Sequence, residues 1–319
     1  MKKTTIGTTG IELTELSFGT ASLGNILDAD GYGVPEERAQ QTLDRFFQGP
    51  MNLLDTSRNY GQGHSEARIG RAVQRYGGWP KGFLLSTKLD RDPDTNRFDA
   101  DRAQASLEES LTALHLSAVD ILHLHDPEYA ADLSEVTRKG GALDALFAMK
   151  EEGLIKATGL AMGRIDIMLP LLRDWDFDVI LNHNRFTLLN READEMYDLA
   201  ASKGMAIINA APFAGGILAK GPQQTSKITY QEASKDALEP VYAIEKLCAD
   251  FGIDMGAAAL QFSLRDPRIT STLCGASSPH SIDNTLAWAQ QDISEDFWQH
   301  MAQIPYSTDN PEAVRLLPR

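Results

Sequence analysis

Short apolar runs alternate with amphipathic segments along the whole chain. The apolar runs are almost unbroken, as in parallel strands that are buried on both faces. This pattern predicts eight strands: Glu15–Thr20, Met51–Asp55, Phe83–Lys88, Ala118–His125, Ile155–Ala161, Asp178–His183, Met205–Ala210 and Ile269–Cys274. The segments between and after the strands predict eight helices: Glu36–Phe47, Ser65–Tyr76, Asp101–His115, Ala142–Glu152, Ile165–Asp174, Arg191–Lys203, Ala237–Phe251 and Pro279–Gln290.

Eight strand–helix units in 319 residues predict an α/β fold, a (β/α)8 TIM barrel that forms one domain over residues 1–319. The alternative is a doubly wound sheet, whose first turn usually carries the phosphate-binding motif G-x-G-x-x-G. The turn at Phe18–Gly24 lacks that motif. Thr4–Thr14, with a turn at Thr8–Gly10, predicts an N-terminal β-hairpin that caps the bottom of the barrel.

Several connections are longer than an ordinary loop between a strand and a helix. They are Asp126–Gly140, Ala211–Lys235 and the tail Gln291–Arg319. Long loops at the C-terminal face of a barrel usually bind the substrate. We therefore expect these segments, together with the loop Ser22–Tyr32, to determine specificity.

Composition narrows the class of partner. The chain carries 30 basic and 45 acidic residues, a net charge of −15, which argues against nucleic-acid binding and against anionic membranes. No run approaches the roughly 18 apolar residues of a membrane span, and the N-terminus lacks the apolar run of a signal peptide. Cys248 and Cys274 have no metal-ligand spacing and predict reduced thiols, hence a cytoplasmic protein without a metal. No feature of the sequence indicates an oligomeric state.

Four titratable residues lie at or just past strand ends. Asp55, Lys88 and His125 each end a predicted strand, and Tyr60 lies in the loop after Asp55. A buried ammonium needs a carboxylate, which Asp55 would supply to Lys88. A phenol beside an ammonium and an imidazole is a tunable proton donor and acceptor, so we expect Lys88 to lower the pKa of Tyr60. This set predicts proton-transfer chemistry.

Each member of this set also has a simpler interpretation. An Asp–Lys pair can be structural, Tyr60 can be a packed aromatic residue, and His123 shares the strand parity of His125. His123, His125 and His183 could instead hold the metal of a barrel hydrolase, which also needs a late carboxylate ligand that is not evident. A non-enzymatic, redox-sensing barrel subunit would bind a cofactor without turnover. The joint pattern favours an enzyme.

Three segments together resemble the signature segments of the aldo-keto reductase superfamily: Asp55–Gly61, Thr87-Lys88 and Val119–Pro127. The resemblance covers nearly the whole chain, including Gly275–Pro279. It implies a barrel that binds a nicotinamide cofactor without a Rossmann fold. It also implies a catalytic tetrad of Asp55, Tyr60, Lys88 and His125, in which Tyr60 is the general acid or base and His125 is chosen over His123.

The resemblance implies that the cofactor contacts come from strand ends and the loops after them: Gly19, Thr20, His183, Pro212, Phe213, Gly215, Gly275, Ala276, Ser277, Ser281, Asn284 and Thr285. Ala161-Met162 replaces the usual Ser-Asn pair that holds the carboxamide, so His183 or Asn184 is the expected substitute. Ala210 stands where a tyrosine normally stacks on the nicotinamide.

The adenosine end of the cofactor site also departs from the common pattern. Gly275-Ala276 and Ser281 stand where Lys-Ser and an arginine often bind the 2′-phosphate of NADP. Because a phosphate needs cationic partners, we expect NAD rather than NADP.

These departures resemble the branch of D-threo-aldose 1-dehydrogenase (L-fucose dehydrogenase), L-galactose dehydrogenase and pyridoxal 4-dehydrogenase. The branch implies oxidation of an aldopyranose of the L-fucose, L-galactose or D-arabinose type at C1 to its lactone. Oxidation of pyridoxal and reduction of small aldehydes or ketones are the alternatives.

Overall fold

The computed structural model describes residues 1–24 and 33–313. Most of the predicted loop Ser22–Tyr32, and the end of the tail, lie outside these residues. The described residues form a closed barrel of eight parallel strands in the order β12-β3-β4-β5-β6-β7-β8-β9. Their bounds are β3 Leu16–Gly19, β4 Leu53–Asp55, β5 Leu84–Leu89, β6 Val119–His125, β7 Ile155–Ala161, β8 Val179–His183, β9 Ala206–Ala210 and β12 Ser271–Gly275. The predicted barrel is confirmed.

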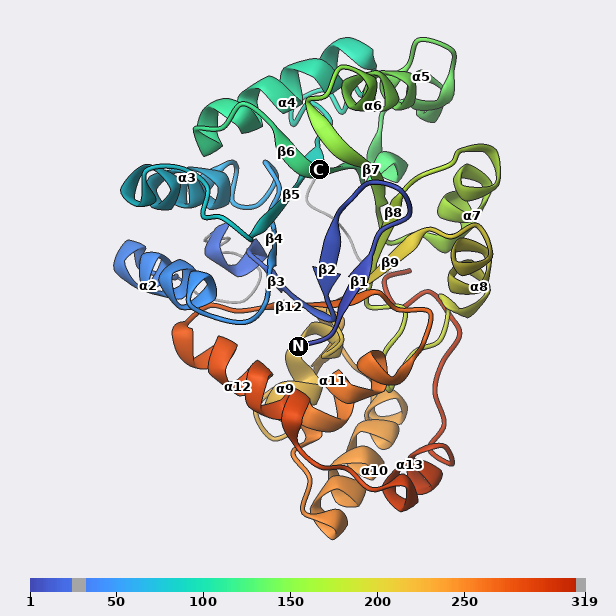
Figure 1. Cartoon of the computed structure of the whole chain (residues 1–319). Helices are drawn as coiled ribbons and strands as arrows, with labels where there is room; N and C mark the ends of the chain where they lie inside the picture. Colours follow the sequence, from blue (N-terminus) through green and yellow to red (C-terminus); the bar gives the residue numbers. More distant parts are fainter. Residues whose placement is uncertain (25–32, 314–319) are drawn as a thin grey trace.

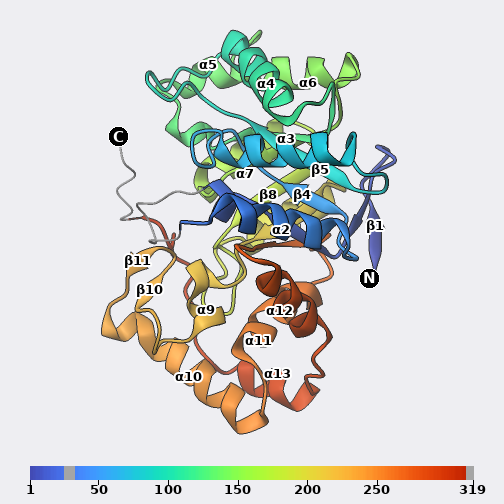
Figure 2. The ribbon, with the colours of Figure 1, turned by 90° about the vertical axis from the view of Figure 1, so that its left-hand side faces the viewer.

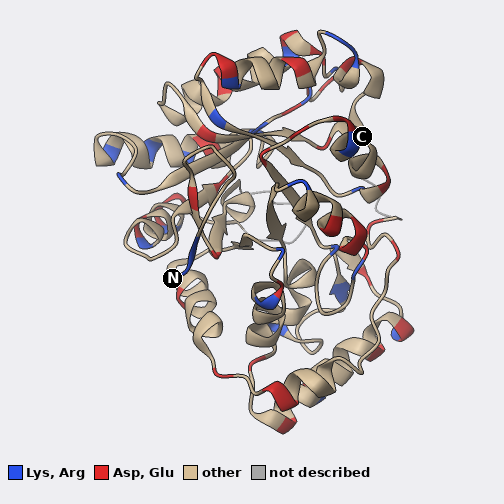
Figure 3. Ribbon diagram, turned by 45° about the vertical axis from the view of Figure 1, so that its right-hand side comes forward, with Lys and Arg blue, Asp and Glu red and all other residues tan. Residues whose placement is uncertain are grey.

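Helices surround the barrel and bury their apolar faces against it (Figure 1). They are α2 Glu36–Phe47, α3 His64–Tyr76, α4 Ala100–Leu114, α6 Ala142–Glu151, α7 Ile165–Asp174, α8 Asp194–Ser202, α11 Met255–Arg265 and α12 Pro279–Gln290. Two more helices, α10 Lys235–Phe251 and α13 Glu295–Met301, pack against each other farther out. In Figure 3, basic and acidic residues are interspersed over the outer helices.

One barrel helix was not predicted. The segment Ala237–Phe251 is helical as expected, but it belongs to α10, whereas α11 packs against β12 and α12. Ala257, Ala258, Ala259 and Leu260 of α11 are all fully buried. Because these four consecutive residues are buried, α11 lacks a continuous polar face on that stretch. Its alanine, leucine and methionine residues favour a helix, and that compositional signal was missed.

An N-terminal hairpin closes one end of the barrel, as predicted. β1 Lys3–Thr5 pairs antiparallel with β2 Glu12–Thr14. Ile6, Ile11 and Leu13 are buried against residues inside the barrel, such as Leu53 and Ile121. The catalytic mouth must therefore lie at the other end, where the strands reach their C-termini.

The long loops gather at that C-terminal end, opposite the hairpin (Figure 2). The loop after β6 contains η2 Pro127–Tyr129 and α5 Leu133–Thr137. The loop after β9 contains η3 Ala214–Gly216, α9 Ile217–Lys220 and a small hairpin of β10 Lys227–Ile228 and β11 Gln231–Glu232. The predicted long loops at the C-terminal face are confirmed.

The tail after α13 returns to the same end of the barrel. Ser307 exchanges backbone hydrogen bonds with Leu189 and Arg191, at 2.9 Å and 2.8 Å. Gln231 donates from Nε2 to the carbonyl of Pro311 at 3.0 Å. The tail is thus tied both to the loop after β8 and to the β10–β11 hairpin. Among the described residues, no helix combines the length and the apolar character needed to cross a membrane.

Candidate active site

The ends of three adjacent strands bring the predicted tetrad together. Asp55 is the last residue of β4 and His125 is the last residue of β6, with Lys88 on β5 between them. In the barrel register Asp55 pairs with Ser86, and Lys88 pairs with His123. Side chains at these positions point into the barrel mouth, where the loop after β4 adds Tyr60.

Lys88 and Asp55 form a buried ion pair. The ammonium donates to Asp55 Oδ2 at 2.7 Å and to the carbonyl of Thr56 at 2.6 Å, and both side chains are 1% exposed. Ser86 donates to the other carboxylate oxygen at 2.9 Å. Burial alone lowers the pKa of Lys88, but the charge of Asp55 outweighs it and the net pKa is raised. Lys88 is therefore a fixed positive charge at the mouth.

The Tyr60 ring lies directly beside this charge. The ammonium of Lys88 lies 4.9 Å from the centre of the ring. Gly61, with φ of 63°, packs so closely against Gly24 that neither residue has room for a Cβ, which fixes the loop that carries Tyr60. Glycine is thus required at this crossing.

Lys88 lowers the pKa of Tyr60 as expected, but the net pKa is raised. Burial raises the pKa of the phenol above its usual value, and the positive charge of Lys88 only partly opposes that effect. The effect of burial on the pKa is larger than the effect of Lys88, because the phenol is removed from water and Asp55 neutralises much of the charge of Lys88. Tyr60 consequently keeps its proton at neutral pH in the protein without ligands.

A second carboxylate, not predicted from the sequence, holds His125. The Nδ1 atom of His125 lies 2.5 Å from Asp90 Oδ1, and the Nε2 atom lies 3.6 Å from Asp126 Oδ2. Burial lowers the pKa of His125, but Asp126 and Asp90 outweigh it, so the net pKa is raised. Asp90 stands two residues beyond Lys88 with the same strand parity. That spacing from Lys88 could have placed the side chain of Asp90 at the mouth.

His123 lies deeper in the barrel than His125. Its side chain is 0% exposed, and neither ring nitrogen has a hydrogen-bond partner within the described part of the chain. The ring packs against Gly159 of β7, where a Cβ would clash with it. Burial holds the pKa of His123 well below its usual value. His125, rather than His123, therefore reaches the mouth.

His183 lies at the mouth beside the tail. Its Nδ1 atom lies 3.4 Å from Glu312 Oε2 and 3.3 Å from the side-chain nitrogen of Asn184. Burial lowers the pKa of His183, which favours a neutral ring. Among residues 1–24 and 33–313, no three His, Cys, Asp or Glu side chains are arranged to hold a metal ion. The barrel hydrolase alternative requires such a group.

The mouth has features that fit a nicotinamide. Four strands end in small residues, Gly19, Ala161, Ala210 and Gly275, which leave room for a flat ring. The Oδ1 atom of Asn184 is buried and lacks a hydrogen-bond partner among the described residues. An unpaired buried acceptor matches the amide N–H of a carboxamide.

The other predicted cofactor residues occupy three places. Thr20 is fully buried and donates to the carbonyl of Asp55 at 2.9 Å, so its side chain supports the strand end. Pro212, Phe213 and Gly215 form the start of the loop after β9, where the Phe213 ring packs edge-on against Trp288. The remaining predicted residues lie at the end of β12 and in the first turns of α12: Gly275, Ala276, Ser277, Ser281, Asn284 and Thr285. The α12 start contains no lysine or arginine.

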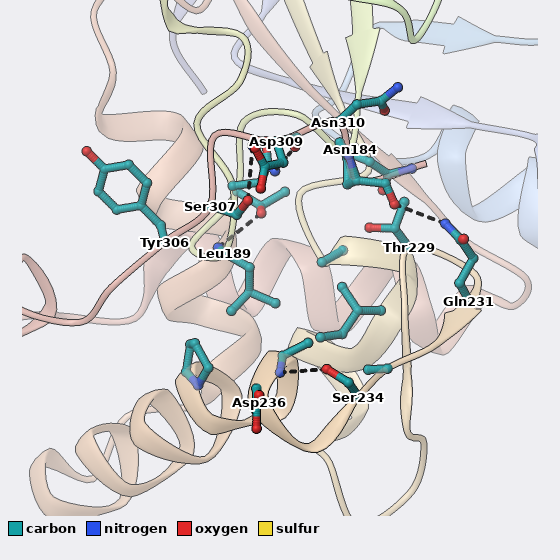
Figure 4. A pocket seen from close by; sticks show the side chains of 18 of the residues that line it. Asn184, Leu189, Thr229, Gln231, Ser234, Asp236, Tyr306, Ser307, Asp309 and Asn310 are labelled. Carbon is teal, nitrogen blue, oxygen red and sulfur yellow. Dashed lines mark hydrogen bonds between the residues drawn. The ribbon is translucent and has the colours of Figure 1, made fainter. Parts of the chain in front are cut away.

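A cavity of about 460 Å³ lies beside this mouth, between the loop after β8, the β10–β11 hairpin and the tail (Figure 4). Asn184, Thr229, Gln231, Tyr306 and Asn310 line part of it. None of the four tetrad residues belongs to its lining. The cavity therefore adjoins the mouth through Asn184 without containing the tetrad.

The fold and the site define a barrel oxidoreductase, because a phenol, an ammonium–carboxylate pair and an imidazole meet at the C-terminal mouth of a parallel barrel. Residues 15–305 match the Aldo/keto reductase family. The chain therefore belongs to the aldo/keto reductase family, whose members are NAD(P)-dependent oxidoreductases. The resemblance read from the sequence is confirmed.

Three characterised relatives are similar over most of their length. The pyridoxal 4-dehydrogenase of Microbacterium luteolum is 27% identical and covers 93% of this chain and 95% of its own. The D-threo-aldose 1-dehydrogenase of a Pseudomonas species is 28% identical and covers 92% of this chain and 94% of its own. The L-galactose dehydrogenase of Arabidopsis thaliana is 29% identical and covers 88% of this chain and 86% of its own.

Solved structures support the fold. The aldo-keto reductase AKR11C1 from Bacillus halodurans, in its holo form, superposes with a TM-score of 0.78 at 20% identity and covers 99% of this chain and 100% of its own. The glycerol dehydrogenase AKR11B4 from Gluconobacter oxydans gives a TM-score of 0.74 at 19% identity, with 95% and 94% covered.

Proposed function

We propose that this protein is an NAD-dependent dehydrogenase that oxidises an aldopyranose at C1 to the corresponding lactone. The observation that carries the proposal is the buried Lys88–Asp55 pair beside Tyr60, with His125 on the neighbouring strand. Two of the relatives are named for the oxidation of an aldose or of galactose, and each matches most of this chain.

The charge around the mouth supports a neutral, hydroxyl-rich substrate. Two carboxyl groups, those of Asp126 and Glu128, lie close enough to His125 to interact with it electrostatically. A third, that of Glu312, lies 3.4 Å from the ring of His183. Burial, together with the charge of Asp126, raises the pKa of Glu128 to about 7. Carboxylates accept hydrogen bonds from hydroxyl groups but repel phosphate. The proposed substrate is therefore an unphosphorylated sugar.

Several residues would hold the cofactor. Asn184 or His183 would bind the carboxamide, and the small residues Gly19 and Ala210 would face the ring. Ser277, in the loop before α12, and Ser281, in the first turn of α12, would bind the adenosine end. When bound, the oxidised nicotinamide supplies the acceptor for the hydride of the substrate. The absence of lysine and arginine from the first turns of α12 supports NAD, because the 2′-phosphate of NADP needs a cation.

The proposed mechanism assigns a role to each tetrad residue. Tyr60 exchanges a proton with the anomeric oxygen, and His125 orients that oxygen. Lys88 stabilises negative charge on the phenol oxygen as the proton moves, and Asp55 keeps Lys88 charged and in place. A positioned proton-transfer group contributes roughly 10²–10⁴-fold to the rate. Exclusion of water by the loops and orientation of the substrate supply the rest.

Oxidation of pyridoxal is the second candidate, supported by the pyridoxal dehydrogenase relative that covers 93% of this chain. Like an aldopyranose, pyridoxal forms a cyclic hemiacetal, so the same proton transfer and hydride removal would give a lactone. The two substrates differ in the aromatic ring, which the polar mouth would contact less favourably than sugar hydroxyls.

The test is a screen of NAD⁺ and NADP⁺ reduction with L-fucose, L-galactose, D-arabinose and pyridoxal. We expect NADH formation with at least one aldose and a much lower rate with pyridoxal and with aldose phosphates. Activity with pyridoxal alone would select the second candidate. Turnover of none of these compounds, with rapid reduction of small aldehydes by NADH, would show that the proposal is wrong.

A further inference from the structure

Asp90 forms a close, buried contact with His125 that lies outside the expected tetrad. The side chains of Asp90 and His125 are 2% and 11% exposed, and the Oδ1 and Nδ1 atoms are 2.5 Å apart. The contact joins Asp90, the residue just after β5, to His125, which lies 35 positions later and is the last residue of the neighbouring strand β6. It therefore depends on the closed barrel rather than on local sequence.

The carboxylate of Asp90 is rigidly held. Ser57 Oγ and the backbone N–H of Asn59 donate to Asp90 Oδ2 at 2.8 Å and 3.0 Å. The backbone N–H of Asp90 donates to Ser106 Oγ at 2.8 Å, and Arg102 Nε donates to its carbonyl at 3.0 Å. Burial raises the pKa of Asp90, but His125, Ser57 and the backbone N–H of Asn59 outweigh it, so the carboxyl is ionised at neutral pH.

An ionised carboxylate can only accept hydrogen bonds, so the Nδ1 atom of His125 must carry a proton. The Nε2 atom lies 3.6 Å from Asp126 Oδ2, which is longer than a hydrogen bond, and is left as an acceptor at the mouth. There the Tyr60 ring stands at 87° to the imidazole, with the ring centres 6.2 Å apart. We propose that Asp90 is a positioning residue that holds His125 with its proton on Nδ1, so that Nε2 takes up the proton that Tyr60 passes on from the substrate hydroxyl. This proposal rests on the proposed function.

The proton transfer balances without an added base. The substrate O–H bond breaks, and its proton goes to the Tyr60 oxygen while the phenol proton goes to His125 Nε2. A bound oxidised nicotinamide would accept the C1 hydrogen with its electron pair, and the C1–O bond would then become a carbonyl. The imidazolium that results is paired with Asp90. Since Tyr60 keeps its proton before the reaction, this relay removes the need for a resting phenolate.

Other titratable groups also interact electrostatically with His125, and all of them remain in place when Asp90 is replaced. They are Asp126 from the loop after β6, Lys88 from β5, His123 from β6, His183 from β8, Glu128 from η2 and the phenol of Tyr60. Asp126 and Asp90 both raise the pKa of His125. Of these charged groups, Asp90 is the one that contacts Nδ1, whereas the neutral Ser57 Oγ lies 3.4 Å from the same atom. Replacing Asp90 therefore changes both the proton position and the pKa of His125.

The kinetic test compares Asp90→Asn with the wild type across pH, using the best aldose and NAD⁺. We expect kcat to fall on the order of 10²-fold, with little change in KM. The acidic limb of the kcat profile should move to lower pH by about one unit, because the lost carboxylate no longer favours the imidazolium. The control is Asp94→Asn, an exposed carboxylate on the loop that follows Asp90, which should leave the profile unchanged. An unchanged limb in Asp90→Asn would overturn the proposal.

A measurement without turnover separates this proposal from the proposed function. Nitrogen NMR of ¹⁵N-histidine-labelled wild type, with the signal assigned by its loss in His125→Gln, reports which ring nitrogen carries the proton. We expect Nδ1 to be protonated in the neutral ring and the pKa of His125 to fall in Asp90→Asn. A neutral ring protonated on Nε2 in the wild type would refute the positioning role, whatever the substrate screen finds and whether or not Asp90→Asn folds.

Discussion

Arg185 and Glu312, 127 residues apart in the sequence, form a buried ion pair of 2.6 Å beside the barrel mouth. Arg185 follows β8, whereas Glu312 belongs to the tail. The same carboxylate lies 3.4 Å from the ring of His183. The pair thus couples the position of the tail to a residue of the candidate cofactor site.

Replacing Glu312 with glutamine should loosen the tail. Arg185 would keep its charge in a site where its side chain is 2% exposed, and removal of one partner of a buried ion pair costs about 3–5 kcal/mol. Glu192, 3.4 Å from Arg185 Nε, should reduce that loss towards the lower value. Denaturant unfolding measures the stability, and limited proteolysis measures release of the tail.

The matched control is Glu295→Gln. Glu295 pairs with Arg265 on the surface and is 70% exposed, so its loss should change stability by no more than about 1 kcal/mol. Equal losses in the two variants would contradict a special role for the Arg185–Glu312 pair.

Tyr60→Phe should abolish most of the turnover while NAD still binds. The phenylalanine ring keeps the packing beside Lys88 but cannot carry a proton, so kcat should fall by roughly 10²–10⁴-fold. Steady-state kinetics measure the loss of turnover, and fluorescence titration with NADH measures whether the cofactor still binds. Tyr242→Phe, at a 46% exposed position of α10, serves as the control and should behave as the wild type. Near-wild-type turnover in Tyr60→Phe would remove the proposed proton donor.

Ser281→Arg should shift the cofactor preference towards NADP. The side chain lies in the first turn of α12, where an arginine can reach a 2′-phosphate. A tenfold gain in kcat/KM with NADP⁺ relative to NAD⁺ corresponds to about 1.4 kcal/mol. Ser281→Gln removes the same contact with Ser278 at 2.9 Å but adds no charge, so the difference between the two variants isolates the cation. If both variants gain equally, the 2′-phosphate is bound elsewhere.

Glu66 should make stability depend on pH. Its side chain is fully buried, and burial raises its pKa from 4.5 to about 7, although Thr87 donates to Oε1 at 2.7 Å. Because the folded state holds this proton more tightly than the unfolded state, stability is lost as pH rises from about 4.5 to about 7. The loss is on the order of 3 kcal/mol above pH 7.

Glu66→Gln removes this titration, so its melting temperature should exceed that of the wild type at pH 8 and approach it at pH 5. Thermal unfolding across this pH range checks the prediction. Glu151→Gln, at an exposed position of α6, should show no such trend. A shift of the same size at both pH values would mean that the ionisation of Glu66 is not the cause.

The barrel strands could be predicted because burial on both faces leaves nearly continuous apolar runs, as at Ile155–Ala161, where the predicted bounds match β7. Asp55, Lys88 and His125 could be placed because strand ends converge in any parallel barrel. Their catalytic roles stay predictions until Tyr60 and its neighbours are substituted.

Other features depended on contacts that no local pattern records. The sign of the shift in the pKa of Tyr60 depends on how far its phenol is removed from water, which the spacing from Asp55 does not reveal. The contact of Asp90 with His125 crosses from one strand end to another, and Glu312 reaches the mouth from the far end of the chain. Burial and long-range approach therefore account for what sequence reasoning missed.

Met1 and the described part of the tail, up to residue 313, lie at opposite faces of the barrel, and this affects where a fusion partner can be attached. Met1 is exposed beside the hairpin at the closed end, whereas the tail crosses the catalytic end. An affinity tag or a surface anchor fused ahead of Met1 should leave substrate access untouched. The same fusion attached to the tail would strain the segment that carries Glu312. Protein immobilised through a fusion ahead of Met1 should therefore retain activity, whereas protein immobilised through the tail should lose it.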